Sequence, residues 1–199
     1  MSWTTFDNTA AGPEQVTAWS GTVDALHAFH DSLVSAAPGA AMLDEIADDL
    51  RRWTAVLTPM AVPEVDRLSG RIPSLPVRGQ AMVPPFVVDV ADASRLEGVV
   101  TFGPYYLGGG AAAHGGMIVT VFDEVLGSLA AMGGRKPART AYLKTDFRAL
   151  VPIGEQIRVR AWFDREDGRK RYLRADMWVG DTLCAEADSL FVELRPTAR

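Results

Sequence analysis

A carboxylate lies in the middle of the most apolar segment of the sequence. Residues 114–132 are apolar at almost every position, and the exceptions recur at helical spacing: Thr120, Asp123 with Glu124, Gly127, Ser128 and Ala131. A helix that is apolar on all sides is surrounded by protein, so this spacing predicts a buried helix with one narrow polar stripe. A carboxylate in such a place needs a hydrogen-bond donor, a wet cavity or a raised pKa. Asp123 is therefore the first candidate for chemistry, as a general base or as a nucleophile.

The elements that position this helix change character along the chain. Apolar residues at helical spacing predict helices over 22–36 and 41–57, after an irregular stretch at residues 1–20. Residues 59–85 are rich in Pro and Gly and predict a loop-rich connection. Because two amphipathic helices are not stable alone, we expect them to pack on the following domain or on a partner chain.

Strand signals flank the central helix. Two short runs precede it and four longer ones follow it, at about residues 86–90, 98–102, 139–149, 154–164, 169–179 and 182–194. A single helix between a hairpin and a meander predicts an α+β fold with an antiparallel sheet against the helix. We therefore expect a helical extension with its connection at residues 1–85 and one domain at residues 86–199.

Composition excludes several classes of protein. The 199 residues, 48% of them hydrophobic, can bury one core, and the net charge of −5 includes no dense basic patch of the kind that binds nucleic acid. The charged pair in the middle of residues 114–132 argues against a membrane span. The single cysteine, Cys184, is expected to be a core residue of a strand. Because one cysteine cannot form an intramolecular disulfide, we also expect a reducing compartment, the cytoplasm. The three histidines have no metal-ligand spacing, so we expect no metal.

The segment HGGMIVTVFDEVLG, residues 114–127, resembles the loop and helix of hotdog-fold acyl-CoA thioesterases of the PaaI-like and human thioesterase-superfamily kind. A strand with Thr140, the turn VPIG, the hairpin DGRKRYLRADM and a last strand CAEADSLFVEL follow in the same order. The resemblance covers about residues 86–194. It implies a hotdog fold, in which a five- or six-stranded antiparallel sheet wraps the central helix, and a homodimer that often associates into a homotetramer.

The resemblance also implies residue roles. Asp123 takes the place of the catalytic acid, the Gly115 amide would polarise the thioester carbonyl, His114 would shape that loop, and Thr140 would assist. Arg148 stands where relatives carry an arginine-proline pair, but Ala149 follows it here. The residues before the HGG, GGGAAA, also lack the polar side chain that many relatives carry.

Free amides at a helix N-terminus suit a carbonyl oxygen that becomes negative under attack, and Gly115 and Gly116 leave room for a ligand. The alternative is that both glycines only form a tight turn. Because eight residues of helix span roughly 12 Å, one carbonyl does not easily reach both Gly115 and Asp123. If both act on one thioester, Asp123 must come from a second copy, which predicts a two-fold dimer with two shared sites.

Further residues are weaker candidates for substrate binding. Glu124 is either a solvated or ion-paired neighbour of Asp123 or a substitute for it. Arg169, Lys170 and Arg171 could bind coenzyme A phosphates, although a solvated hairpin is the usual reason for such a run, and Arg135 with Lys136 raises the same question. His27 and His30 lie on an amphipathic helix, where packing is the commoner role.

These observations predict a cytoplasmic hotdog-fold thioesterase that hydrolyses an acyl-CoA without metal or organic cofactor. A non-catalytic acyl-CoA or lipid-binding protein of the same fold is the alternative from another class. A hotdog dehydratase is a further alternative, which we rank low because those families carry a different pattern of Asp and His. The acyl preference stays open.

Overall fold

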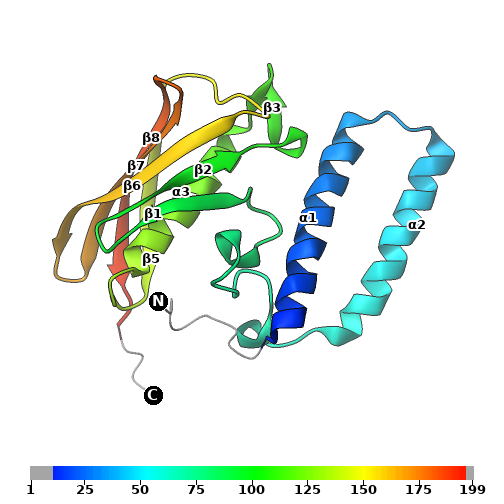
Figure 1. Cartoon of the computed structure of the whole chain (residues 1–199), viewed down its shortest axis with the longest axis horizontal. Coiled ribbons are helices and arrows are strands. Elements are labelled where there is room, and N and C mark those ends of the chain that lie inside the picture. The colour runs from blue at the N-terminus through cyan, green and yellow to red at the C-terminus, as the bar shows by residue number, and fades with distance from the viewer. Residues whose placement is uncertain (1–10, 196–199) are drawn as a thin grey trace.

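The computed structural model describes residues 11–195, which form a pair of long helices and a curved sheet with one helix against it (Figure 1). The long helices are α1 (Pro13–Ser35) and α2 (Ala40–Leu57), and α3 (Gly115–Ala131) is the helix against the sheet. Four short 3-10 turns and the small strands β3 (Leu107–Gly109) and β4 (Ala112–Ala113) lie between these elements. The α+β hotdog architecture predicted from the sequence is confirmed.

Six antiparallel strands make the sheet, in the order β1-β2-β6-β7-β8-β5. Their bounds are Phe86–Ala91, Arg95–Thr101, Ala138–Phe147, Gln156–Asp167, Lys170–Val179 and Thr182–Glu193, in the sequence order β1, β2, β5, β6, β7, β8. Strands β1 and β5 are the two edges. Strand β5 therefore has a free side along its length within the described chain, and it lies against α3.

The core fills the space between α3 and the inner face of the sheet. On α3 the buried residues are Ile118, Val121, Phe122, Val125, Leu126, Leu129 and Ala130. They contact inward-facing residues of the strands, among them Ile157, Val159, Leu173, Met177 and the buried Cys184. The helix is not enclosed on all sides, however, because Asp123 is exposed. The open side of α3 is the side that carries the polar stripe.

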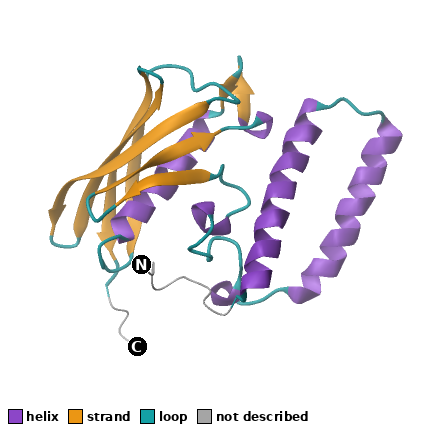
Figure 2. Cartoon of the chain, viewed as in Figure 1, coloured by secondary structure: helices purple, strands orange, loops and turns teal. Residues whose placement is uncertain are grey.

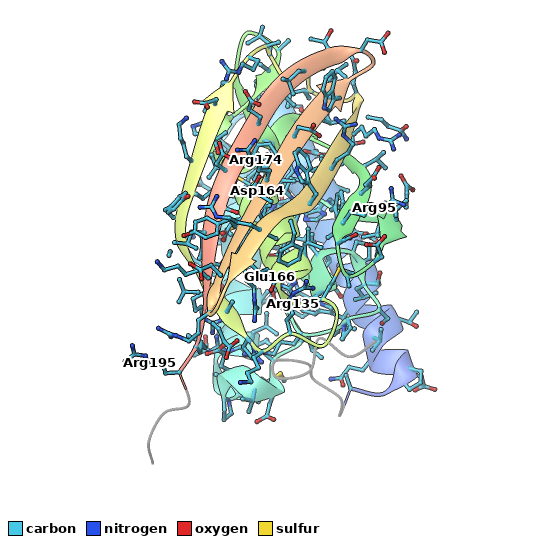
Figure 3. All side chains as sticks on the ribbon, turned by 90° about the vertical axis from the view of Figure 1, so that its left-hand side faces the viewer. Arg95, Arg135, Asp164, Glu166, Arg174 and Arg195 are labelled. Atoms are coloured by element: carbon cyan, nitrogen blue, oxygen red, sulfur yellow. The ribbon has the colours of Figure 1, made fainter. Side chains whose placement is uncertain are left out.

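The outer face of the sheet carries ion pairs between neighbouring strands. Arg174 lies between Asp164 and Asp188, at 3.5 and 3.0 Å, and Figure 3 shows Arg174 beside Asp164 on this face. Arg160 and Asp176 form a second pair at 2.6 Å. The pairs of Arg174 are exposed and stabilise the fold little, whereas the Asp176 carboxylate is buried. These ion pairs make this face polar, so the core lies on the α3 side of the sheet alone.

Helix α1 begins nine residues earlier than the sequence pattern indicates. The prediction of an irregular stretch at residues 1–20 is wrong from Pro13 onward, and residues 1–10 lie outside the described part. Proline at the first position of a helix lacks only an amide that the helix would leave unpaired anyway. Helix α1 packs on the domain as expected: Val23 is buried, and the Tyr105 amide donates to the Asp31 carboxylate at 2.8 Å.

Helix α2 lies apart from the sheet, beyond α1 (Figure 1). Its predicted apolar stripe is present but uncovered, since Leu43, Leu50, Trp53 and Leu57 are 45 to 59% exposed. None of the residues of α2 is buried. Within residues 11–195 only α1 packs on the domain, so packing of α2 on a partner chain, the other outcome that the sequence predicts, stays a prediction.

The connection between α2 and β1 folds back between the helix pair and the sheet (Figure 2). Residues Pro76–Gly79 make a 3-10 turn in which Val77 and Arg78 have φ values of 42° and 56°. Both values lie in the left-handed region, which residues with a Cβ rarely adopt. The turn brings Val77 against the core and Arg78 against α3.

Candidate functional site

Asp123 lies on the open side of α3, next to the first half of β5. The Thr140 hydroxyl donates a hydrogen bond to Oδ1 of Asp123 at 2.8 Å. The α3 carboxylate therefore has a partner that fixes its orientation, while its remaining lone pairs face a cavity. The structure brings together the two side chains that the resemblance to thioesterases places in one site.

The N-terminus of α3 presents one unpaired amide. His114 is the N-cap, and its Nδ1 accepts the Gly116 amide at 3.0 Å, while its own amide donates to the Tyr106 carbonyl at 2.7 Å. In residues 11–195 the Gly115 amide has no hydrogen-bond partner. Gly116 is therefore engaged through its amide, whereas Gly115 keeps a donor at the positive end of the helix dipole.

The aromatic ring of Phe147 covers the side of Gly115 that faces β5. A Cβ added at Gly115 would lie 3.3 Å from Cζ of Phe147. The ring is 53% exposed, so it can shift by a few tenths of an ångström. The absence of a side chain at Gly115 keeps the approach to its amide open.

Asp123 and Gly115 belong to opposite parts of one regular helix. They are eight residues apart, which corresponds to roughly 12 Å along the axis. A carbonyl oxygen within hydrogen-bond distance of the Gly115 amide is thus beyond the reach of the Asp123 carboxylate of the same chain. Within one chain, the structure does not bring these two predicted site residues together.

A cavity of about 470 Å³ contains Asp123. Its α3 wall is formed by Gly127, Ala131 and other residues with short side chains, which leave the space, and Thr140 closes the β5 side. Five arginines and three acids line it, namely Arg67, Arg71, Arg78, Arg135, Arg139, Glu64, Asp123 and Glu124. The cavity is thus polar, with a small excess of positive charge.

Several of these arginines have acidic partners. Nη1 of Arg78 lies 2.6 Å from Oε1 of Glu124, and Arg135 pairs with Glu166 at 2.5 Å. Figure 3 shows Arg135 and Glu166 close together at the lower end of the sheet. The sequence leaves open whether Arg135 binds a coenzyme A phosphate. In the structure its guanidinium already pairs with the Glu166 carboxylate.

Glu124 is the ion-paired neighbour of Asp123 rather than a solvated one. Its side chain is only 17% exposed. Burial raises the pKa of Glu124, the neighbouring charge of Asp123 adds to the rise, and Arg78 opposes it. Arg78 thus favours the ionised form of the Glu124 carboxylate against the effect of burial.

A second cavity of about 300 Å³ lies on the other side of this ion pair. Arg78, Glu124 and Ser128 line both cavities. The other residues of the second cavity are mostly apolar, among them Leu75, Val77, Phe86, Val88, Leu96, Val125 and Met132. The polar and the apolar cavity are therefore neighbours with a charged partition between them.

The basic hairpin does not reach the Asp123 cavity. Neither Arg169 nor Lys170 lines it, and Nη1 of Arg169 donates to the Glu193 carbonyl at 3.0 Å. Arg171 is buried, and its Nη1 donates to the carbonyls of Ala130 and Lys136, both at 2.8 Å. Arg171 therefore caps the C-terminal end of α3, and its guanidinium is already occupied there.

Arg148 lies near the end of β5, outside the cavity. Its Nε donates to Oε1 of Glu186 at 2.7 Å. The side chain is occupied by a strand-to-strand ion pair. The structure gives it no contact with Asp123.

The sequence pattern missed the arginines of the connection between α2 and β1. Arg67, Arg71 and Arg78 line the cavity of Asp123, although the prediction treats residues 59–85 as a loop alone. The only signal in the sequence is three arginines in a stretch otherwise rich in Pro, Gly and apolar residues. That signal does not say which of them faces the helix.

No three His, Cys, Asp or Glu side chains of residues 11–195 gather in a way that could hold a metal ion. In the same part of the chain, every helix is too short or too polar to cross a bilayer.

Comparison with known proteins agrees with this architecture. Residues 110–187 match the family model of the thioesterase superfamily. Over 107 residues the chain is 35% identical to the acyl-coenzyme A thioesterase THEM4 of Bos taurus. This match covers 53% of this chain and 44% of that protein. The chain thus spans less than half the length of this relative.

The solved structures that match differ in how much of this chain they cover. Protein RHA08564, described as a thioesterase superfamily protein, matches with a TM-score of 0.74 and 26% identity, over 87% of this chain and 94% of its own. That match must include most of the N-terminal extension. The PaaI protein of E. coli matches with a TM-score of 0.51 and 14% identity, over 54% of this chain and 82% of its own, and shows the fold alone. The hotdog fold, the HGG-initiated helix and the family-model match agree that residues 110–187 are similar to the thioesterase superfamily.

Proposed function

We propose that this protein is an acyl-CoA thioesterase, which hydrolyses an acyl-CoA to the free acid and coenzyme A. The observation that carries the proposal is the Asp123 carboxylate on a cavity wall, oriented by the Thr140 hydroxyl at 2.8 Å. The unpaired Gly115 amide at the start of α3 supports it. The name of the bovine relative, an acyl-coenzyme A thioesterase, points to the same substrate class.

The chemistry needs a base or nucleophile and an oxyanion donor. Asp123 either takes a proton from the attacking water or attacks the thioester carbon itself. The Gly115 amide stabilises the carbonyl oxygen as it becomes negative, helped by the helix dipole. The carbon–sulfur bond then breaks and the coenzyme A thiolate leaves and takes up a proton. Where Asp123 is the nucleophile, water then hydrolyses the acyl–aspartyl anhydride to the free acid and restores the carboxylate. Water is the only other reactant, so the proposal includes no metal and no organic cofactor.

We further propose that each site is shared between two copies of the chain. A separation of roughly 12 Å along α3 keeps Asp123 and Gly115 of one copy from acting on one thioester. A two-fold dimer solves this by placing Asp123 of one subunit opposite Gly115 of the other, twice. The unpaired edge strand β5 and the exposed Tyr142 and Phe147 on it offer a surface for the second copy. Two such dimers can associate into a tetramer, and the single buried Cys184 fits the cytoplasm.

The first test replaces Asp123 by asparagine. We expect the Asp123→Asn protein to stay folded and dimeric and to lose most thiol release from a panel of acyl-CoA esters, from short aliphatic to long-chain and aromatic. Undiminished turnover would remove Asp123 from its role. Tight acyl-CoA binding by the unmodified protein without any thiol release would instead favour a non-catalytic binding protein.

The second test isolates the Gly115 amide. Gly115→Pro removes the N–H at the first helical position, where proline is well tolerated, and His114 already has the extended backbone that a following proline needs. We expect a loss of about 10²-fold or more in kcat. Gly115→Ala is the matched control, because it adds the Cβ but keeps the N–H.

Mixed dimers test the sharing of the site. If sites are shared, a dimer of one Asp123→Asn subunit and one Gly115→Pro subunit has one intact site and one doubly defective site. A random equal mixture should then regain about a quarter of the unmodified activity. No recovery in verified mixed dimers would place both residues in one chain and overturn the shared site.

A further inference from the structure

Two cavities meet at one ion pair. The polar cavity of about 470 Å³ contains Asp123, and the apolar cavity of about 300 Å³ adjoins it. Arg78, Glu124 and Ser128 line both of them. We call these three side chains the partition.

The partition is held by several contacts of Arg78. Its Nη1 lies 2.6 Å from Oε1 of Glu124 and donates to Oγ of Ser128 at 3.3 Å, and its Nε donates to the Gly70 carbonyl at 3.1 Å. The side chains of Arg78 and Glu124 are only 26% and 17% exposed. A charged pair that is this far removed from water and fixed at three points is an effective barrier to an apolar chain.

The backbone around Arg78 is held in a conformation that residues with a Cβ rarely adopt. Val77, Arg78 and Gly79 all have φ values between 42° and 74°. Such a run persists only when its surroundings impose it. Trp19 of α1 contributes: its Nε1 donates to the Gly79 carbonyl at 2.9 Å, and its ring leaves no room for a Cβ at Gly79. The helical extension thereby positions a residue that faces the candidate site.

We propose that Arg78 is a specificity-determining residue, which with Glu124 closes the Asp123 cavity against the apolar cavity and so limits the length of the acyl chain. The inference rests on the proposed function, because the acyl chain points toward the partition only when its thioester lies at Asp123. The apolar lining behind the partition, including Leu75, Leu96 and Met132, would accept methylene groups if the partition were open.

The test opens the partition without leaving a lone charge. Arg78→Ala alone would strand the half-buried Glu124 carboxylate, so the variant is Arg78→Ala with Glu124→Ala. In the full chain, kcat/KM is measured for saturated acyl-CoA esters of increasing length. We expect the ratio of long-chain to short-chain kcat/KM to rise by about fourfold for each methylene that enters the apolar cavity. Arg78→Lys, which keeps a cation in place, should leave the chain-length profile close to that of the unmodified protein.

A filling variant shows where the chain goes. Val88 lines the apolar cavity and is 48% exposed, so Val88→Phe narrows the cavity with little risk to the fold. Added to the open variant, it should remove the gain for long chains. A gain that survives this change would mean that the extra chain lies elsewhere, which overturns the partition.

Binding measurements separate this inference from the proposed function. In the Asp123→Asn background, dissociation constants for the same esters are measured by calorimetry with closed and open partitions. Hydrolysis with an unchanged length profile overturns the partition alone. Binding with the predicted change in profile but no hydrolysis by the unmodified protein overturns the proposed function alone. Absence of acyl-CoA binding at every length overturns both.

Discussion

Replacing Arg171 by methionine removes a buried cap from the C-terminal end of α3. Its Nη1 donates at 2.8 Å to the Ala130 carbonyl, one of the last four of the helix, and at the same distance to the Lys136 carbonyl. Burial lowers the pKa of the guanidinium, and Glu193 at 3.4 Å partly compensates. The side chain is 4% exposed, so water cannot take its place in the variant without rearrangement.

The loss of stability follows from these bonds. A hydrogen bond to a charged group contributes about 1.5–3 kcal/mol, so two such bonds contribute about 3–6 kcal/mol. Methionine recovers part of this because the variant no longer desolvates a cation, and we expect a net loss of about 3 kcal/mol. For a chain of this length the Tm should fall by about 6–12 °C.

Urea denaturation followed by circular dichroism measures this loss, with Arg169→Met as the matched control. Arg169 neighbours Arg171 in sequence but is exposed, and its Nη1 donates to the Glu193 carbonyl alone, so its variant should stay within about 0.5 kcal/mol of the unmodified protein. An Arg171→Met protein of unchanged stability but weakened acyl-CoA binding would refute the capping role and return Arg171 to phosphate binding.

Three further outcomes test the site and its surroundings. Thr140→Val should reduce kcat/KM by about tenfold, because Asp123 loses a charge-assisted hydrogen bond, whereas Thr140→Ser should stay near the unmodified value; equal losses in both would exclude the hydroxyl. Because the folded-state pKa of Glu124 is raised above 4.5, the stability it contributes is present below that pH and is lost as the pH rises through the raised value. The stabilities of the unmodified protein and of Glu124→Gln should therefore diverge in favour of the variant as the pH rises above 4.5, and a difference that does not change with pH would contradict the shift. Hydrogen bonds from Ser94 lower the pKa of Asp92 from 3.8 to about 2, so its contribution to stability should be lost progressively as the pH falls from 3.8 through that lower value. The stability difference from Asp92→Asn should shrink over this range, and an unchanged difference in strong acid would speak against these bonds.

The order of strands and the central helix could be predicted from the sequence because their signals are local. Alternating apolar residues predict β5 at 139–149 and β8 at 182–194, against observed bounds of Ala138–Phe147 and Thr182–Glu193. The apolar run of residues 114–132 predicts α3, which spans Gly115–Ala131. Of the candidate site, the proximity of Asp123 to Thr140 follows from the resemblance and is present in the structure.

The rest of the site depends on contacts that no local pattern encodes. Arg78 reaches Glu124 across 46 positions of sequence, through a turn with φ values that its residue types do not favour. Arg171 belongs to a run of three basic residues that is typical of a solvated hairpin, yet it alone turns inward. Burial of one member of a charged run is set by the end of a helix packed beneath it, which the run itself does not reveal.

The hydrogen bond from Trp19 to the Gly79 carbonyl joins the first helix to the wall of the candidate site. The two parts of the chain are consequently not interchangeable modules. A chimera that keeps the hotdog domain but takes its N-terminal helices from another protein would inherit a different wall, and with it a different substrate range, even if every residue of the sheet and of α3 were retained.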